Sequence, residues 1–117
     1  MADQPRTIVL IQSDPFENHQ PAEALRIALG LASGENQVEV ILLEKAVSIL
    51  FEDPENFKDG EVIEKFLPSL KDWLKTFYVE RTALNGLQPA DSDYSITAVS
   101  LDEVADLLAE ANRFIIF

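Results

Sequence analysis

The loop that follows the first apolar run of the chain contains the sequence's single histidine beside two carboxylates. Asp14, Glu17 and His19 lie in this loop, and these side-chain types perform acid–base catalysis or bind metal ions. Either role needs a second matched group, because one imidazole alone makes a poor site. No second histidine exists in the chain, and we name no catalytic residue and no metal ligand. Asp14 and His19 stay candidates for lining a pocket, with a solvated or structurally bonded loop histidine as the alternative.

A second group of polar side chains follows a later apolar run, at Tyr78, Glu80 and Arg81. In open parallel sheets, ligands bind beyond the carboxyl ends of the strands, near the point where the strand order reverses. We therefore expect Tyr78, Glu80 and Arg81 to line the mouth of a pocket together with the first loop. A rim ion pair, or free surface charges, is the alternative for Glu80 and Arg81.

Several kinds of chemistry are excluded by what the sequence lacks. There is no cysteine, which excludes disulfides, thiolate metal ligands and a thiol nucleophile, and favours a reducing, cytoplasmic location. The four glycines are scattered and none forms a phosphate-binding loop. No serine lies in a nucleophile-elbow sequence. We therefore expect no cofactor.

The charge of the chain restricts its partners. Asp and Glu number 21 against nine Lys and Arg, which gives a net charge of −12. Such a field repels nucleic acid and anionic membranes, and we expect neither as a partner. The first apolar run, residues 7–11, is too short for a signal sequence or a membrane span. The acidic surface either keeps the protein soluble or meets a basic partner.

Short apolar runs rich in β-branched residues alternate with helical patterns along the chain. The first run, residues 7–11, has no polar alternation, which indicates a strand buried on both faces of a parallel sheet. The chain as a whole predicts one domain, residues 1–117, with a five-stranded, mostly parallel α/β sheet and helices on both faces. The strands are expected at residues 7–11, 38–43, 76–79, 96–99 and 114–117.

The helices between these strands carry their own signals. Pro21 suits a first helical turn, and Leu25, Ala28, Leu29 and Ala32 then form one apolar stripe. Residues 62–74 also have helical spacing, but Pro68 should kink or split that helix. Residues 100–103, Ser-Leu-Asp-Glu, form a capping box before a third helix.

Residues 8–16, 22–32 and 38–43 together resemble the start of DsrE/DsrF-like proteins. In these proteins a first strand ends in a small polar loop with a proline and leads into a helix rich in alanine and leucine. Residues 43–47 are similar to the family's turn into a short helix. The resemblance covers most of the chain and implies a compact subunit with flavodoxin-like layering.

The resemblance also has implications for activity. Active members of the family pass persulfide sulfur along a relay, using a cysteine at the end of the third strand, at a set spacing before a glycine. Counting that spacing back from Gly86 gives Tyr78. Tyrosine cannot carry a persulfide, so the chain is similar to the family's cysteine-free members. Family members assemble into trimers, hexamers or hetero-hexamers.

We therefore expect a non-catalytic DsrE/DsrF-like protein, a structural or partner-docking subunit related to sulfur-relay complexes. It would be a homo-oligomer (trimer or hexamer) or a hetero-oligomer with related subunits. The apolar residues 114–117 and the aromatic stretch around Trp73 suit a sheet strand, core or subunit interface. Two alternatives stay open. One is a small-molecule-binding protein or enzyme with a pocket near Asp14, His19, Tyr78 and Glu80, and the other is an acidic protein-interaction module.

Overall fold

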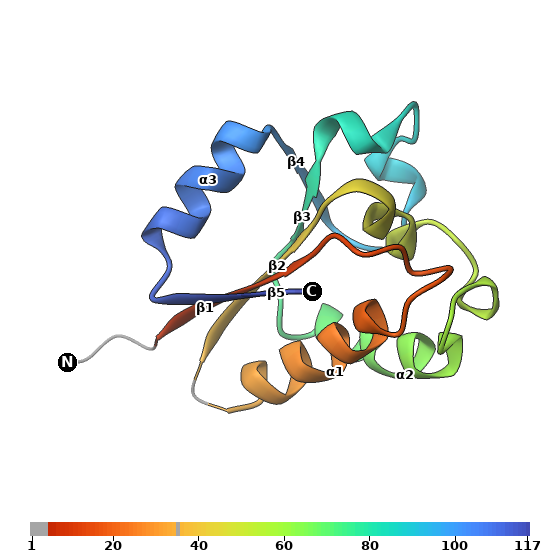
Figure 1. Cartoon of the computed structure of the whole chain (residues 1–117), viewed down its shortest axis with the longest axis horizontal. Coiled ribbons are helices and arrows are strands. Elements are labelled where there is room, and N and C mark those ends of the chain that lie inside the picture. Colours follow the sequence, from red (N-terminus) through yellow and green to blue (C-terminus); the bar gives the residue numbers. More distant parts are fainter. Residues whose placement is uncertain (1–4, 35) are drawn as a thin grey trace.

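In a computed structural model that describes residues 5–34 and 36–117, the chain forms a five-stranded sheet with helices on both faces (Figure 1). All neighbouring strands are parallel, in the order β4-β3-β2-β1-β5. The predicted fold class is confirmed, and the sheet is parallel throughout. The strands are β1 (Arg6–Ile11), β2 (Gln37–Leu42), β3 (Phe77–Glu80), β4 (Ile96–Val99) and β5 (Arg113–Ile116).

Two helices cover one face of the sheet and a third covers the other. Helices α1 (Gln20–Ala32) and α2 (Gly60–Lys71) pack side by side on the first face, and α3 (Leu101–Glu110) lies on the second (Figure 1). From β1 to β4 the chain steps across the sheet in one direction. Helix α3 then carries it back to β5, on the far side of β1, so the strand order reverses between β1 and β5. Short 3₁₀ helices fill the connections: η1 (Glu44–Leu50), η2 (Pro54–Asn56), η3 (Arg81–Leu84) and η4 (Pro89–Asp91).

Strand β1 is buried on both faces, as its unbroken apolar run predicts. Val9 and Ile11 belong to the core beneath α1 and α2, whereas Ile8 and Leu10 belong to the smaller core beneath α3. Neighbouring strands align with this alternation, since Val9 pairs in register with Val40 of β2. The burial predicted for Val9 is confirmed.

Helix α1 begins with Pro21 in its first turn, as expected, and buries a face rich in alanine. Leu25 and Ala28 on that face are completely buried. Leu29, which the apolar spacing places on the same stripe, is only partly buried and packs against the margin of the core. Buried Ala24 and Ala28 shift the centre of the face away from Leu29, so Leu25 is the side chain that fills the core.

Helix α2 is continuous from Gly60 to Lys71 and contains Pro68. Of the kink or split predicted for this proline, the split does not occur. Proline inside a helix removes one hydrogen bond and costs roughly 3 kcal/mol. Pro68 lies in the last turn, and the helix buries Ile63, Leu67 and Leu70 against the core, which offsets that cost.

The capping box before α3 is confirmed. The Ser100 hydroxyl oxygen accepts a hydrogen bond from the Glu103 backbone N–H at 3.1 Å, and the Glu103 carboxylate accepts one from the Ser100 N–H at 3.0 Å. Val104 is buried beneath the helix, and Leu107 and Leu108 pack beside it. The short helix thus has a fixed start and one apolar face on the sheet.

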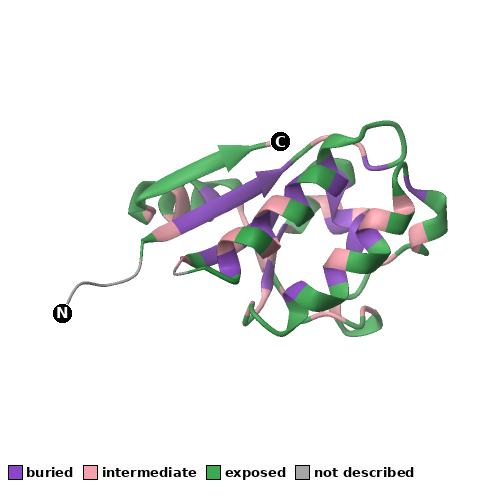
Figure 2. Ribbon diagram, turned by 90° about the horizontal axis from the view of Figure 1, so that it is seen from below, coloured by how far each residue is buried: buried purple, intermediate pink, exposed green. Residues whose placement is uncertain are grey.

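Strand β5 forms an edge of the sheet and is exposed along its length, beside a buried β1 (Figure 2). It is fastened at both ends. Arg113 donates hydrogen bonds to Thr7 and Asn36 at 3.0 and 3.1 Å, and the Phe117 carbonyl accepts the N–H of Gln12 at 2.8 Å. The strand expected at residues 114–117 is therefore present and tied to the sheet.

Candidate functional site

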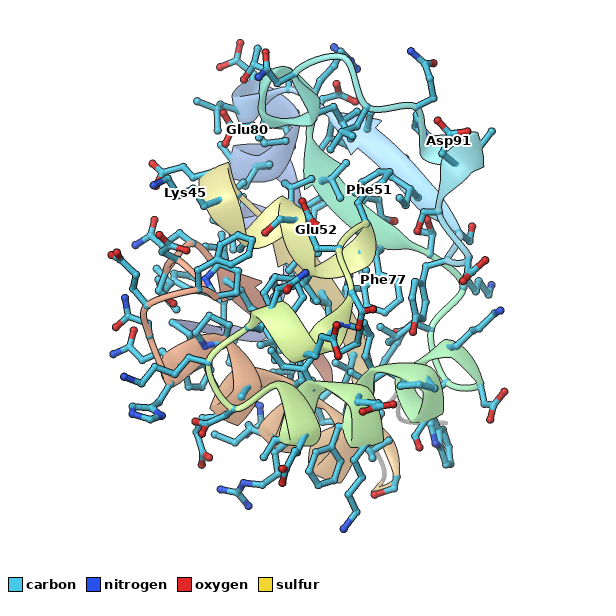
Figure 3. All side chains as sticks on the ribbon, turned by 90° about the vertical axis from the view of Figure 1, so that its right-hand side faces the viewer. Lys45, Phe51, Glu52, Phe77, Glu80 and Asp91 are labelled. Carbon is cyan, nitrogen blue, oxygen red and sulfur yellow. The ribbon has the colours of Figure 1, made fainter. Side chains whose placement is uncertain are left out.

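The carboxyl ends of β1, β2 and β3 bring three polar segments to one edge of the sheet, which faces the viewer in Figure 3. We call this region the carboxyl-edge site and define it by Asp14, Lys45, Glu80, Arg81 and Thr82. Ligands of parallel α/β sheets bind at this edge. Figure 3 shows Lys45 and Glu80 on neighbouring segments, and both line a shallow depression of about 280 Å³.

Asp14 is held by two contacts in the loop after β1. Its Oδ1 accepts a hydrogen bond from the Phe16 backbone N–H at 2.9 Å, and its Oδ2 lies 3.5 Å from Lys45 Nζ. The Asp14 side chain is largely buried, whereas that of Lys45 is exposed. The pair joins the loop after β1 to the start of η1, and leaves the Lys45 ammonium open to solvent.

Glu80, the last residue of β3, is also held on both carboxylate oxygens. Its Oε1 accepts a hydrogen bond from the Glu44 backbone N–H at 3.1 Å, and its Oε2 accepts one from the Thr82 hydroxyl at 2.8 Å. Glu44 has a φ of 53°, in the left-handed region that non-glycine residues rarely adopt. Glu80 therefore stabilises a strained turn after β2.

Arg81 forms an ion pair at the rim, which was the alternative to lining a pocket. Its Nη2 lies 3.3 Å from Glu103 Oε1 and 3.3 Å from the Ala98 carbonyl oxygen. The hydrogen bond from the Ser100 backbone N–H, with smaller contributions from the Ser100 hydroxyl and Arg81, holds the pKa of Glu103 below its usual value. Arg81 thus joins the end of β3 to the start of α3.

His19 lies outside this set of contacts. Its Nδ1 bonds to the Asp59 carboxylate, and it is not among the residues lining the depression at Glu80. The two residues precede α1 and α2 respectively. The pair therefore joins the starts of the two helices. His19 is thus a structurally bonded loop histidine, which was the alternative to a role in a pocket.

Tyr78 does not lie where the family spacing was expected to place it. It is the second residue of β3, in register with Ile41 of β2 and Thr97 of β4, and the strand continues to Glu80. The expectation that Tyr78 ends the third strand is wrong by two residues. Its side chain packs on the core beneath α3. Tyr78 and Glu80 share a face of the sheet, but Glu80 alone reaches the carboxyl edge.

Three residues that line the depression at this edge were not predicted from the sequence, namely Glu44, Lys45 and Thr82. Lys45 is the second residue after the second apolar run, residues 38–43, so the rule that placed Glu80 at the edge could also have placed Lys45 there. The contribution of Glu44 is its backbone N–H, which depends on a left-handed φ and has no side-chain signal.

Within residues 5–34 and 36–117, no three His, Asp or Glu side chains converge as a metal site would require. No helix in the described part of the chain is both long enough and apolar enough to cross a membrane. The carboxyl-edge site is thus a set of paired charges around an open depression, with one exposed ammonium at Lys45.

An all-parallel five-stranded sheet in the order β4-β3-β2-β1-β5, with two helices on one face and one on the other, defines a three-layer α/β protein. Its sequence contains no cysteine. The profile of the DsrE/DsrF-like family matches residues 6–117, and the chain belongs to that family, which is related to sulfur-relay proteins. Among solved structures, it is similar to the crystal structure of the ychN protein from E. coli, with a TM-score of 0.79 and 17% identity. That match covers 97% of this chain and 100% of the other. A comparison with curated proteins finds no match.

Proposed function

We propose that this chain is a non-catalytic DsrE/DsrF-like subunit that works by docking, and that its first partner is a second copy of itself. The observation that carries the proposal is the exposed edge strand β5. Three consecutive apolar side chains there, Phe114, Ile115 and Ile116, are 49%, 37% and 52% exposed. An apolar edge strand is a template for pairing with another chain, and monomeric proteins usually cover or charge such an edge.

Both faces of the edge take part in this apolar surface. Phe114 and Ile116 share a face with Ile8 and Leu10, on the side of α3, whereas Ile115 shares the opposite face with Val9. A partner strand that hydrogen-bonds to β5 would therefore cover apolar side chains above and below the sheet. The pairing would join two sheets into one continuous layer.

The distribution of charge favours a second copy as the occupant. Residues 111–117 contain no acid, in a chain with a net charge of −12. Two copies that meet through β5 bring their least acidic segments together and keep the acidic regions apart. Self-pairing about a two-fold axis makes the two β5 strands antiparallel. Such a contact gives a dimer, and it is also one of the contacts from which a hexamer can be built.

The absence of catalysis is supported by the carboxyl-edge site. The sequence has no cysteine, so it offers no side chain on which a persulfide can form. Asp14, Glu80 and Arg81 each have partners within the chain. Carboxylates held in this way stabilise turns and leave no free base beside a nucleophile. The alternatives, a small-molecule enzyme at this edge and an acidic interaction module, receive less support than docking through β5.

The docking proposal is tested by mass measurement with a matched pair of variants. Wild-type protein at tens of micromolar should give an oligomer by size-exclusion chromatography with light scattering. Ile116→Glu should shift it towards the monomer, because it places a charge on the exposed apolar edge that the contact would cover. Leu101→Glu is the control, since Leu101 is also exposed (59%) but starts α3, and it should leave the mass unchanged.

Two results would contradict self-docking. One is a strictly monomeric wild type at that concentration, and the other is an oligomer that survives Ile116→Glu. A wild type that is monomeric alone, but forms a complex with a cysteine-bearing DsrE/DsrF-like subunit, would replace the second copy with a related subunit.

A further inference from the structure

A second hollow lies at the opposite edge of the sheet from the carboxyl-edge site. It has a volume of about 410 Å³ and opens at the amino-terminal ends of β2 and β3. We call it the amino-edge cavity. The residues in its wall that matter for its chemistry are Val38, Glu39, Trp73, Lys75, Thr76 and Tyr78. Neither the family nor the docking role assigns a purpose to it.

The cavity exists because β2 and β3 pair over only a short length. The register joins Ile41 to Tyr78 and Leu42 to Val79. Within the described residues, the earlier part of β2, residues 37–40, has no register partner in β3. The chain arriving from α2 passes through residues 72–76 before it joins the sheet. The two strands therefore open apart toward this edge, and the hollow lies between them.

Glu39 gives the cavity wall a carboxylate with one unused oxygen. Its Oε1 accepts a hydrogen bond from Arg6 Nε, and its Oε2 is buried with no hydrogen-bond partner among the described residues. A buried carboxylate oxygen without a donor is costly, and native structures rarely leave one unpaired. Glu39 lines the cavity, and the terminal torsion of glutamate is broad, so its carboxylate can rotate to present an oxygen to a ligand there. The Glu39 carboxylate in the cavity wall thus lacks one hydrogen-bond donor.

Trp73 gives the cavity an open aromatic surface. It is the only tryptophan of the chain, it is the second residue after the end of α2, and 55% of it is exposed. A large exposed indole beside a hollow offers a surface on which a flat group of a ligand can pack. The face of the indole ring also attracts cations. The same ligand can then meet the Glu39 carboxylate with a donor and Trp73 with a ring.

We propose that the amino-edge cavity binds a small amine that carries an aromatic or similarly flat apolar group. The ammonium donates a hydrogen bond to Glu39 Oε2, and the flat group covers Trp73. A charged donor suits an ionised acceptor better than a neutral one does. The net charge of −12 draws cations toward the protein. Free amines and amino acids share this chemistry, and Lys75 in the wall is available to the carboxylate of the latter.

The only tryptophan provides the measurement. We expect 2-phenylethylamine to cause a saturable change in tryptophan fluorescence, with a dissociation constant of about 1 mM or tighter for a ligand of this size. Calorimetry checks the affinity independently of the fluorophore. Phenylalanine added as a second probe distinguishes an amino acid from a plain amine, because only the former also offers a carboxylate to Lys75.

A matched pair of variants separates the site from the general attraction of cations. Glu39→Gln keeps an amide oxygen that can accept the hydrogen bond from Arg6, but it removes the negative charge. It should weaken the binding of 2-phenylethylamine by about tenfold. Glu61→Gln changes the net charge equally at an exposed position on α2 and should leave binding unchanged. Circular dichroism confirms that both variants fold.

Three results would overturn the proposal. The first is no saturable signal up to the solubility limit of either amine, as expected if only water satisfies Glu39. The second is equal weakening by Glu39→Gln and Glu61→Gln. The third is tighter binding of 3-phenylpropionate, which has the ring and a carboxylate but no amine, because Lys75 would then anchor the ligand in place of Glu39.

Discussion

Truncating Leu25 to alanine tests the packing of α1 on the sheet. Leu25 is completely buried, and its nearest helical neighbours on the same face are the small residues Ala22 and Ala28. These residues cannot expand into the space, so the variant should leave a cavity. Leucine-to-alanine changes of this kind cost about 2–5 kcal/mol. We expect Leu25→Ala to lie in the upper half of that range.

Leu29→Ala is the matched comparison on the same helix. Leu29 is partly buried at the margin of the core, so solvent and neighbouring side chains can fill the vacated space. We expect a cost of about half that of Leu25→Ala, since both the transfer and the cavity contributions shrink with exposure. Glu55→Gln, at an exposed position in η2, should change the free energy of unfolding by less than about 0.5 kcal/mol.

Urea denaturation followed by circular dichroism measures all three variants. With an m-value of about 1–3 kcal/mol/M, a loss of several kcal/mol moves the midpoint by more than about 1 M. The expected order of cost is Leu25→Ala, then Leu29→Ala, then Glu55→Gln. A Leu29→Ala variant as destabilised as Leu25→Ala would show that α1 presents a different face to the sheet, and the assignment of its core face would have to be abandoned.

Three further predictions concern sulfur chemistry, pH and salt. Wild-type protein incubated with a persulfide donor should gain no mass that survives denaturation, because the chain has no cysteine. A Glu80→Cys thiol should react faster with a disulfide reagent than a Tyr78→Cys thiol, because Glu80 lines the open depression whereas Tyr78 packs on the core beneath α3. Because the pKa of Glu103 is lowered in the folded protein, its ionised form stabilises the fold at pH values above the ordinary glutamate pKa of about 4.3. The stability advantage of wild type over Glu103→Gln in urea should thus be lost as pH falls through the lowered pKa, and an unchanged difference at acid pH would count against the cap. Self-association measured by sedimentation should strengthen with added salt, which screens the charge of −12 on each copy; weakening would point to an ionic contact.

The strands and the fold class could be predicted because their signals are local. Residues 7–11 have no polar alternation, and such a run is typical of a strand in a parallel sheet that is covered on both faces. The capping box at Ser100 and Glu103 is similarly contained in four consecutive residues. Pro68 was expected to kink or split its helix, yet α2 continues through it. The local cost of the proline is outweighed by the burial of apolar side chains of the same helix against the core.

The site could be predicted only in part, because its geometry depends on pairing between distant segments. The last residue of β3 is set by its register with β2 and β4, which a spacing counted from Gly86 does not contain. His19 is bonded to Asp59, a residue far along the chain with a left-handed φ of 56°. The exposure of β5 depends on the strand order, since the same apolar residues would be buried in a central position.

The strand order has a consequence for synthesis and folding. Strand β1 is made before the other strands and β5 after them, yet the two are neighbours in the sheet. Until β5 emerges from the ribosome, β1 can pair with a neighbouring strand on only one side, and Ile8 and Leu10 lie next to an open edge. Unpaired apolar edges are the sites at which incompletely folded chains aggregate. This protein should therefore depend on chaperones more during its synthesis than after it, and chains that stall before residue 113 should be captured by them.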